Sequence, residues 1–286
     1  MKRRDFLRTT LAGSAVVGLS PALLRACTTH DQLHDFGIIS GVLSNELKED
    51  PRGTLEQIAE MGYKHLEFGG TFGMEAAELK QLLRDIGLNP LAGGSNLAGF
   101  HGDGMQKLID DQLEMNKKYL VCYWPWMNNP DDLITMDDLK FAVDEFHRIG
   151  EACNKSGLRF AYHNHDHEFR PLDDGMMPYD YYLQNTDPEL VTMQLDLYWA
   201  AVGGVDPATY IQKYPGRYEL LHVKDAYDLS DRQSFACVGE GVIDFERIFK
   251  LRETGGFKHL VVEKDGAVHG IACAQTSINH LNSLNF

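Results

Sequence analysis

Residues 158–168 read Leu-Arg-Phe-Ala-Tyr-His-Asn-His-Asp-His-Glu, a mainly apolar run that ends in a dense polar cluster. The first part, 158–162, has the length and the side chains of a strand buried in a sheet. The second part, 163–168, holds three imidazoles and two carboxylates within six residues. Imidazoles and carboxylates are the groups that bind divalent metals. The stretch therefore indicates a buried strand with a candidate site at its carboxyl end.

The same arrangement returns three times later in the chain, each time at the end of a short apolar run. These positions are Asp196 after 190–195, His222 and Lys224 with the run 218–221, and Glu263 after 259–262. Helical segments separate the runs, as they do in a parallel sheet. Side chains at the same end of successive parallel strands converge in a closed barrel. We therefore expect these side chains to surround one point.

Strand-like and helix-like stretches alternate along residues 36–286. We expect strands at 36–42, 63–68, 88–93, 119–124, 158–163, 191–196, 218–224 and 259–263, and helices at 54–61, 76–86, 105–118, 138–156, 179–185, 207–213, 245–253 and 274–284. Eight such repeats over about 250 residues predict an α/β fold, a single (β/α)8 TIM barrel. An open sheet would need a Gly-rich phosphate loop after its first strand, and Gly37 and Gly41 flank that strand instead.

The composition predicts an acidic globular protein. The chain is 43% hydrophobic and 24% charged, with a formal net charge of −15. Residues 1–26 carry five Lys or Arg and one Asp, so the 22 basic and 41 acidic residues of the remaining chain give a charge near −19. Such a surface repels phosphate backbones. No nucleic acid is therefore expected as a partner, which argues against a DNA-repair endonuclease.

Residues 1–26 have the composition of an export signal. Residues 2–8 read Lys-Arg-Arg-Asp-Phe-Leu-Arg, and a weakly apolar stretch follows at 9–24. This resembles a Tat signal peptide, whose pattern is two arginines, one further residue and then Phe-Leu. Gly13, Gly18 and Pro21 argue against a permanent transmembrane helix. We predict export to the periplasm, with a polar linker at 27–35 and the barrel at 36–286.

The cysteines give one further prediction about location. Residues 24–27 read Leu-Arg-Ala-Cys and resemble a lipobox, in which Cys27 becomes lipidated, although Arg25 departs from the small or apolar residue usual there. A lipid on Cys27 would be the membrane attachment. The remaining cysteines show no CxxC spacing, and we expect small buried side chains rather than disulfide partners. They are Cys122, Cys153, Cys237 and Cys273.

The three later strand ends predict a metal site. Asp196, His222 and Glu263 end neighbouring strands, whose ends lie about 5 Å apart. Two carboxylates and one imidazole suit Mn²⁺, Zn²⁺, Co²⁺ or Mg²⁺, and no thiolate favours a structural zinc. Taken singly, each residue also fits a structural role, as a loop cap, a core histidine or a solvated carboxylate. Their coincidence favours one bound divalent metal.

The residues around these positions resemble the xylose isomerase-like TIM barrels, the superfamily of sugar phosphate isomerases and epimerases and of AP endonuclease 2. The resemblance covers residues 36–286 and is sharpest at 162–169, 195–200, 221–225, 238–245 and 262–265. It implies an ion held by a Glu from strand five, an Asp from strand six, a His from strand seven and a Glu from strand eight. Asp196, His222 and Glu263 match the last three.

Strand five departs from the family pattern, because His163 stands where the Glu is expected. The nearest carboxylate, Glu168, lies five residues on. Either Glu168 loops back to the ion, or His163 or His165 binds it; we expect Glu168 as the fourth ligand. In addition, Trp199 replaces a His that epimerases of the family often carry. Both departures argue against an epimerisation mechanism that uses one carboxylate on each face of the substrate.

The resemblance implies a metal-dependent isomerase or epimerase that acts on a sugar or keto-sugar through an enediolate. His163, His165 and Glu263 are the candidate bases. Lys224 lies on the same side of its strand as His222, where it either stabilises a developing oxyanion or pairs with Asp225 or another carboxylate.

Two other functions stay open. Loss of a leaving group from the next carbon would make the protein a β-eliminating lyase or dehydratase on keto-sugars or keto-glycosides, which the His-rich strand-five cluster favours. A non-catalytic exported sugar-binding protein would keep the aromatic residues but would not need a converging metal set.

The substrate-binding residues are predicted from their place at strand ends. Trp124, Trp126 and Trp199 offer aromatic faces for the apolar side of a sugar ring, and Glu67 offers an acceptor for a hydroxyl. The strand ends carry no cluster of Arg or Lys that would bind a phosphate group, so a neutral sugar is expected rather than a sugar phosphate. The sequence is compatible with a homo-oligomer.

Overall fold

A computed structural model of the chain describes residues 35–127 and 134–286. The predicted Tat signal, the lipobox and nearly all of the linker lie outside these residues. Eight described strands close into a parallel barrel in the order β1-β10-β7-β6-β5-β4-β3-β2. The strands are β1 (Gly37–Ile39), β2 (His65–Glu67), β3 (Asn89–Asn96), β4 (Tyr119–Trp124), β5 (Arg159–His163), β6 (Val191–Asp196), β7 (Leu220–Val223) and β10 (His259–Val262). The predicted (β/α)8 barrel is confirmed.

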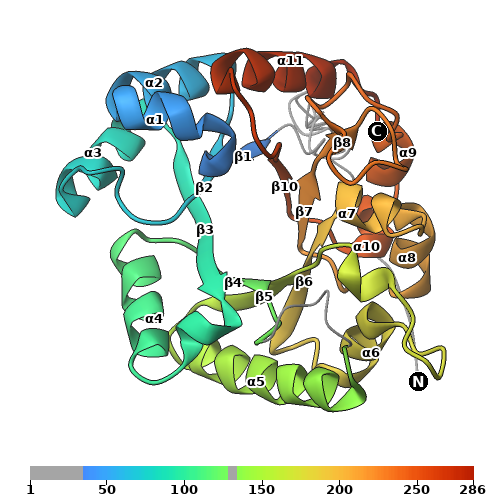
Figure 1. Cartoon of the computed structure of the whole chain (residues 1–286). Coiled ribbons are helices and arrows are strands. Elements are labelled where there is room, and N and C mark those ends of the chain that lie inside the picture. The colour runs from blue at the N-terminus through green and yellow to red at the C-terminus, as the bar shows by residue number, and fades with distance from the viewer. Residues whose placement is uncertain (1–34, 128–133) are drawn as a thin grey trace, which may run out of the picture. The chain divides into compact units, whose positions relative to one another are not determined.

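Helices cover the outside of the barrel (Figure 1). They are α1 (Ser44–Glu49), α2 (Pro51–Met61), α3 (Ala76–Ile86), α4 (Gly104–Glu114), α5 (Met136–Lys155), α6 (Pro178–Asn185), α7 (Leu197–Val202), α8 (Pro207–Lys213), α9 (Phe245–Phe249), α10 (Arg252–Gly255) and α11 (Gly270–Ser283). Local sequence sets their ends: Thr135 and Asp138 form a capping box at the start of α5, and Gly62 ends α2 with φ 106°. None of the described helices is both long and apolar enough to cross a membrane.

The strands separate two apolar regions. The larger one lies between strands and helices, and a smaller one, which includes Ala92, Val121 and Val261, fills the barrel interior. At Gly94 the backbones of β3 and β4 approach so closely that a Cβ would lie 1.7 Å from the carbonyl oxygen of Val121. Glycine is therefore required there. This packed interior makes the strand ends, rather than the centre of the barrel, the place for a site.

The loop after β7 carries a short antiparallel hairpin of β8 (Asp225–Ala226) and β9 (Phe235–Ala236). The Asp225 carboxylate holds the following segment, since it accepts hydrogen bonds from the backbone N–H groups of Gly239, Gly241 and Ile243 at 3.0–3.2 Å. Asp225 is thus a buried loop anchor, and it is not the ion-pair partner that the sequence suggested for Lys224.

A disulfide joins Cys237, just after β9, to Cys273 on α11. The expectation that these cysteines stay unpaired was wrong, because 36 residues separate them in sequence and only the fold brings them together. Cys122 and Cys153 are buried and free, as expected.

Candidate metal centre

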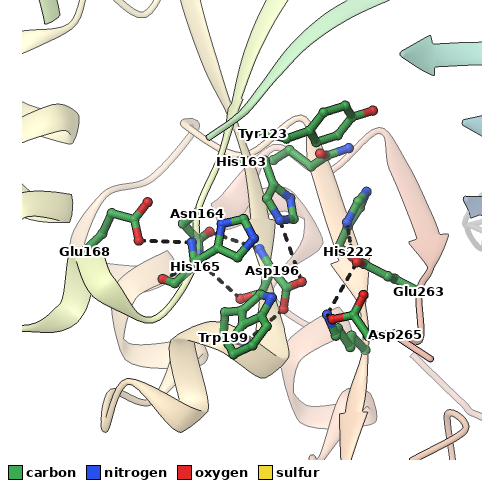
Figure 2. A network of polar contacts seen from close by, with 12 residues as sticks. Tyr123, His163, Asn164, His165, Glu168, Asp196, Trp199, His222, Glu263 and Asp265 are labelled. Atoms are coloured by element: carbon green, nitrogen blue, oxygen red, sulfur yellow. Dashed lines mark hydrogen bonds and ion pairs between the residues drawn. The ribbon is translucent and has the colours of Figure 1, made fainter. Parts of the chain in front are cut away.

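Four side chains converge at the carboxyl end of the barrel, one from each of four neighbouring strands. They are His163 at the end of β5, Asp196 at the end of β6, His222 on β7 and Glu263 just after β10. One donor atom from each lies within 4.8 Å of the donor atoms of the other three. Figure 2 shows the four groups turned toward a common centre. This set contains the three residues that the strand-end pattern predicted as ligands.

Strand pairing accounts for this convergence. Asp196 lies beside His222 in the register of β6 and β7, and Val262, which precedes Glu263, lies beside Val223. Because parallel strands in a barrel place their carboxyl ends on one rim, side chains at these positions meet above the barrel interior.

The Asp196 carboxylate has one oxygen in use and one without a hydrogen-bond partner. Oδ1 accepts the backbone N–H of Trp199 at 2.9 Å and caps α7. Oδ2 is buried and has no donor among the described residues, while Nε2 of His163 lies 4.0 Å away, beyond hydrogen-bond distance. A buried carboxylate oxygen left without a donor is costly. Two imidazoles and two carboxylates around this oxygen fit a divalent cation of the Mn²⁺, Co²⁺ or Zn²⁺ type.

The charges of the cluster are strongly perturbed. Burial raises the pKa of Asp196. Burial also disfavours a charged His222, but Glu67 and Glu263 on either side of the ring raise its pKa to about 10. Without a cation, His222 therefore holds a second proton between two carboxylates. A cation would displace this proton, so metal binding should release protons.

Glu168 does not reach the cluster. The Tyr162 hydroxyl donates to its Oε1, and the backbone N–H of His165 donates to its Oε2 at 3.0 Å. Glu168 lies in the short helix His167–Phe169, and Figure 2 shows its side chain apart from His222 and Glu263. Glu168, which the sequence analysis expected as the fourth ligand, therefore lies outside the set of four converging donors, and His163 provides the strand-five group of that set. Burial raises the pKa of Glu168 to about 7.

His165 is an imidazole beside the four donors but outside their set. Its ring centroid lies 4.9 Å from that of His163, and Trp124 and Trp199 pack against it at 5.0 and 5.5 Å. Its Nδ1 has no hydrogen-bond partner among the described residues. Burial lowers the pKa of His165 to about 4, so the ring is neutral near pH 7 and can accept a proton.

Lys224 is fully buried next to Glu263. Its Nζ lies 3.4 Å from Oε1 of Glu263 and 2.5 Å from Oδ2 of Asp265. Burial would lower the pKa of Lys224, but Glu263 and Asp196 raise it overall, so the side chain is charged. The ammonium nitrogen of Lys224 also lies 4.7 Å from the ring centroid of Trp199. This position fits a group that stabilises negative charge on an oxygen at the site.

A cavity of about 590 Å³ opens beside Lys224. It is lined by Trp199, Arg232, Gln233, Phe235, Lys264, Asp265 and Gly266. Arg232 reaches it from the β8–β9 hairpin and also donates to Oδ1 of Asp166 at 2.8 Å. The sequence offered no signal for Arg232, Gln233 and Phe235, since they lie in the β8–β9 hairpin rather than at the end of a barrel strand.

Two predicted substrate contacts are buried and already engaged with other side chains. Trp126 is 6% exposed and packs against Tyr182 in the core outside the barrel. Glu67 is fully buried, and its two oxygens accept hydrogen bonds from Tyr123 and Gln194. Neither side chain is free to bind a sugar. Trp124 and Trp199 do lie at the site, against His165.

Comparisons with known proteins agree with the barrel fold. The sequence profile described as xylose isomerase-like TIM barrel matches residues 55–283. A protein named inosose dehydratase from Geobacillus kaustophilus is 26% identical over 270 residues, which cover 80% of this chain and 86% of that protein. A relative of the same name from Bacillus cereus is 23% identical over 79% of this chain and 68% of its own length.

Solved structures show the same fold. A sugar phosphate isomerase/epimerase from Parabacteroides distasonis matches with a TM-score of 0.75 and 26% identity, over 90% of this chain and 96% of that one. The structure of IOLI protein with a bound zinc atom matches with a TM-score of 0.67 at 14% identity, over 87% and 95% of the two chains. Since the family profile covers well over half of the sequence, the chain belongs to the xylose isomerase-like TIM barrel family.

Proposed function

We propose that the protein is a divalent-metal-dependent dehydratase or β-eliminating lyase that acts on a keto-sugar or a related cyclic ketone. The relatives and the donor set support the broader class of metal-dependent sugar isomerases, epimerases and dehydratases. The choice of elimination within that class rests on the orientation of Glu168.

Epimerisation by two carboxylates needs an acid–base group on each face of the reacting carbon. Glu168 is the strand-five carboxylate, and it is turned away toward Tyr162 and the backbone of His165. With His163 among the four donors, His165 remains as the neutral base beside the cluster. A base on one face is sufficient for β-elimination.

Elimination assigns a task to each group at the site. When bound, a divalent cation would supply a Lewis acid for the ketone oxygen and its neighbouring hydroxyl. His165 accepts the proton from the carbon next to the ketone. The electron pair of that C–H bond forms the new C=C bond, and the substituent on the following carbon leaves with its bonding pair. The protonated His165 returns its proton to this leaving oxygen, which departs as water or an alcohol. Lys224 stabilises the negative charge that develops on oxygen.

Trp124 and Trp199 pack against His165, which is half-buried. The cavity beside Trp199 is large enough for a sugar-sized molecule. The aromatic wall and the buried Lys224 together fit a polyhydroxylated ketone.

Isomerisation or epimerisation is the second candidate, and the name of the Parabacteroides structure favours it. Both reactions begin with removal of the same proton as elimination does. The fate of the resulting intermediate separates them, because an isomerase or epimerase returns a proton to carbon, whereas a dehydratase loses water.

The test is incubation of the metal-loaded protein with a panel of keto-sugars and inososes in D2O, followed by NMR and mass spectrometry. Elimination predicts a product that is lighter by one water or one alcohol. This product contains a new C=C bond or is the dicarbonyl tautomer of that enol. A product of unchanged composition with deuterium at one carbon would assign isomerisation or epimerisation instead. His165→Gln should lose turnover while it keeps bound metal.

We also propose that the protein works outside the cytoplasm. The twin-arginine pattern at residues 2–8 and the Cys237–Cys273 disulfide support this, because disulfides persist in oxidising compartments. Fractionation of cells that express the full chain tests it. The Arg3→Lys, Arg4→Lys double variant should stay inside the cell, and equal export of both forms would refute a Tat signal.

A further inference from the structure

Glu67 and His222 form a buried contact across the barrel. Glu67 ends β2 and His222 lies on β7, with β1 and β10 between these strands. Both side chains are at most 1% exposed, and Oε2 of Glu67 lies 3.2 Å from Nε2 of His222. The other ring nitrogen, Nδ1, contacts Oε2 of Glu263, which is another of the four donors.

An imidazole that binds a metal through one nitrogen must carry its proton on the other. A carboxylate next to the second nitrogen selects that tautomer and holds the ring in one orientation. We propose that Glu67 is a positioning residue that fixes His222 with a proton on Nε2 and directs Nδ1 at the cation. This inference rests on the metal binding that is part of the proposed function.

Glu67 is itself held in place from two more strands. The Tyr123 hydroxyl on β4 donates to Oε1 at 2.7 Å, and Nε2 of Gln194 on β6 donates to Oε2 at 2.8 Å. Gln194 precedes the ligand candidate Asp196 by two residues, so both face the barrel interior. The Tyr123 ring also lies 5.8 Å from the His163 ring (Figure 2). One buried network therefore contacts several parts of the donor set.

The opposite end of the barrel offers a matched control. There Tyr119, on the same strand as Tyr123, donates to Oε2 of Glu219 at 2.9 Å. Glu219 also contacts Arg159 at 3.2 Å and Lys258 at 2.9 Å. This is a second partly buried Tyr–Glu pair, and its partners include no donor of the cluster. A purely structural role for Glu67 would give the two pairs equal effects on metal binding.

The experiment compares Glu67→Gln and Tyr123→Phe with Glu219→Gln and Tyr119→Phe. Each full-length protein is stripped by chelation, and its affinity for Co²⁺ and Zn²⁺ is measured by competition with a chromophoric chelator. We expect about 10- to 100-fold weaker binding for Glu67→Gln, a smaller loss for Tyr123→Phe and wild-type affinity for both controls.

A second readout reports the ring itself. In the Co²⁺-loaded protein, the exchangeable Nε2–H of His222 should give a strongly shifted proton NMR signal. This signal should move or disappear in Glu67→Gln, move slightly in Tyr123→Phe and stay unchanged in the controls. If Glu67→Gln does not fold, Tyr123→Phe carries the test.

Two results would overturn the proposal: wild-type affinity and an unchanged signal in Glu67→Gln and Tyr123→Phe, or equal losses in the test and control variants. A metal-loaded protein that converts no keto-sugar would refute the proposed reaction and leave this test intact. Failure of the wild-type protein to bind any metal would refute both.

Discussion

The two ends of the barrel carry similar residues in opposite electrostatic states. At the amino end, the Glu219 carboxylate is surrounded by Arg159, Lys258 and the Tyr119 hydroxyl. Burial alone would raise the pKa of Glu219, but these partners lower it overall. At the carboxyl end, burial raises the pKa of Asp196, and one of its oxygens has no donor among the described residues.

His222 at the carboxyl end differs from the two histidines at the amino end. His65 and His259 pack edge to face at 4.8 Å at the amino end, and burial lowers the pKa of both. At the carboxyl end, His222 lies between two carboxylates, which raise its pKa to about 10. The amino end thus supplies its own cations and keeps its histidines neutral. At the carboxyl end, carboxylates surround His222 and the buried cation of Lys224, and a divalent metal ion would complete this arrangement.

The largest expected effect comes from Asp196→Asn. It removes one anionic donor and keeps the shape of the side chain, including an oxygen that can cap α7. Metal affinity should fall by more than about 100-fold, because groups that only orient a ligand already contribute about 10- to 100-fold. Elemental analysis should show near-zero metal, with turnover lost in parallel. Glu219→Gln should keep its metal; full metal content in Asp196→Asn would refute the site.

Removal of the metal from the carboxyl end of the barrel by a chelator should lower the stability of the protein. A ligand present at a hundred times its Kd stabilises the native state by about 2.7 kcal/mol. For a barrel of this size, removal of the metal should lower Tm by about 5–10 °C. Differential scanning calorimetry with and without chelator measures the shift, and added Mn²⁺, Co²⁺ or Zn²⁺ should reverse it. An equal shift in Asp196→Asn would mean that the stabilising ion binds elsewhere.

Acid should lower the unfolding free energy, because it protonates the buried histidines at the amino end of the barrel. The pKa of His259 is lowered to about 3, mainly by burial. The positive charges of His65, Lys118 and Lys258 also lower it, and the negative charge of Glu219 raises it. Because the unfolded state has the higher pKa, it binds more protons, and stability is lost as pH falls from about 6.5 toward 3. Urea unfolding of the metal-free protein between pH 7 and 4 measures this loss. His259→Gln should reduce the pH dependence; an unchanged slope would contradict the assignment.

The smallest expected effect comes from Tyr119→Phe. Loss of its hydrogen bond to Glu219 should cost about 1 kcal/mol of unfolding free energy, since Arg159 and Lys258 still satisfy the carboxylate. Metal affinity should be unchanged. Urea titration and metal competition on the same sample check both statements. A changed metal affinity would remove the distinction between the two ends.

Several parts of the site were predictable because they depend on position along a single strand. Asp196, His222 and Glu263 each end an apolar run, and parallel pairing then places them on one rim. His165 and Lys224 lie two residues beyond His163 and His222, just past the ends of β5 and β7, which keeps them at the same rim of the barrel. Trp124 and Trp199 also lie at the site, beside His165.

The sequence by itself determined the barrel and the three strand-end donors, because hydrophobic periodicity and strand ends are local properties. Tertiary structure decided what each side chain contacts. Tyr162 turns Glu168 away, Tyr182 holds Trp126 in the core, and Glu67 meets His222 across 155 residues of sequence. The Cys237–Cys273 pair likewise forms only in the fold. These contacts depend on which strands and helices become neighbours, and spacing along one strand does not encode that.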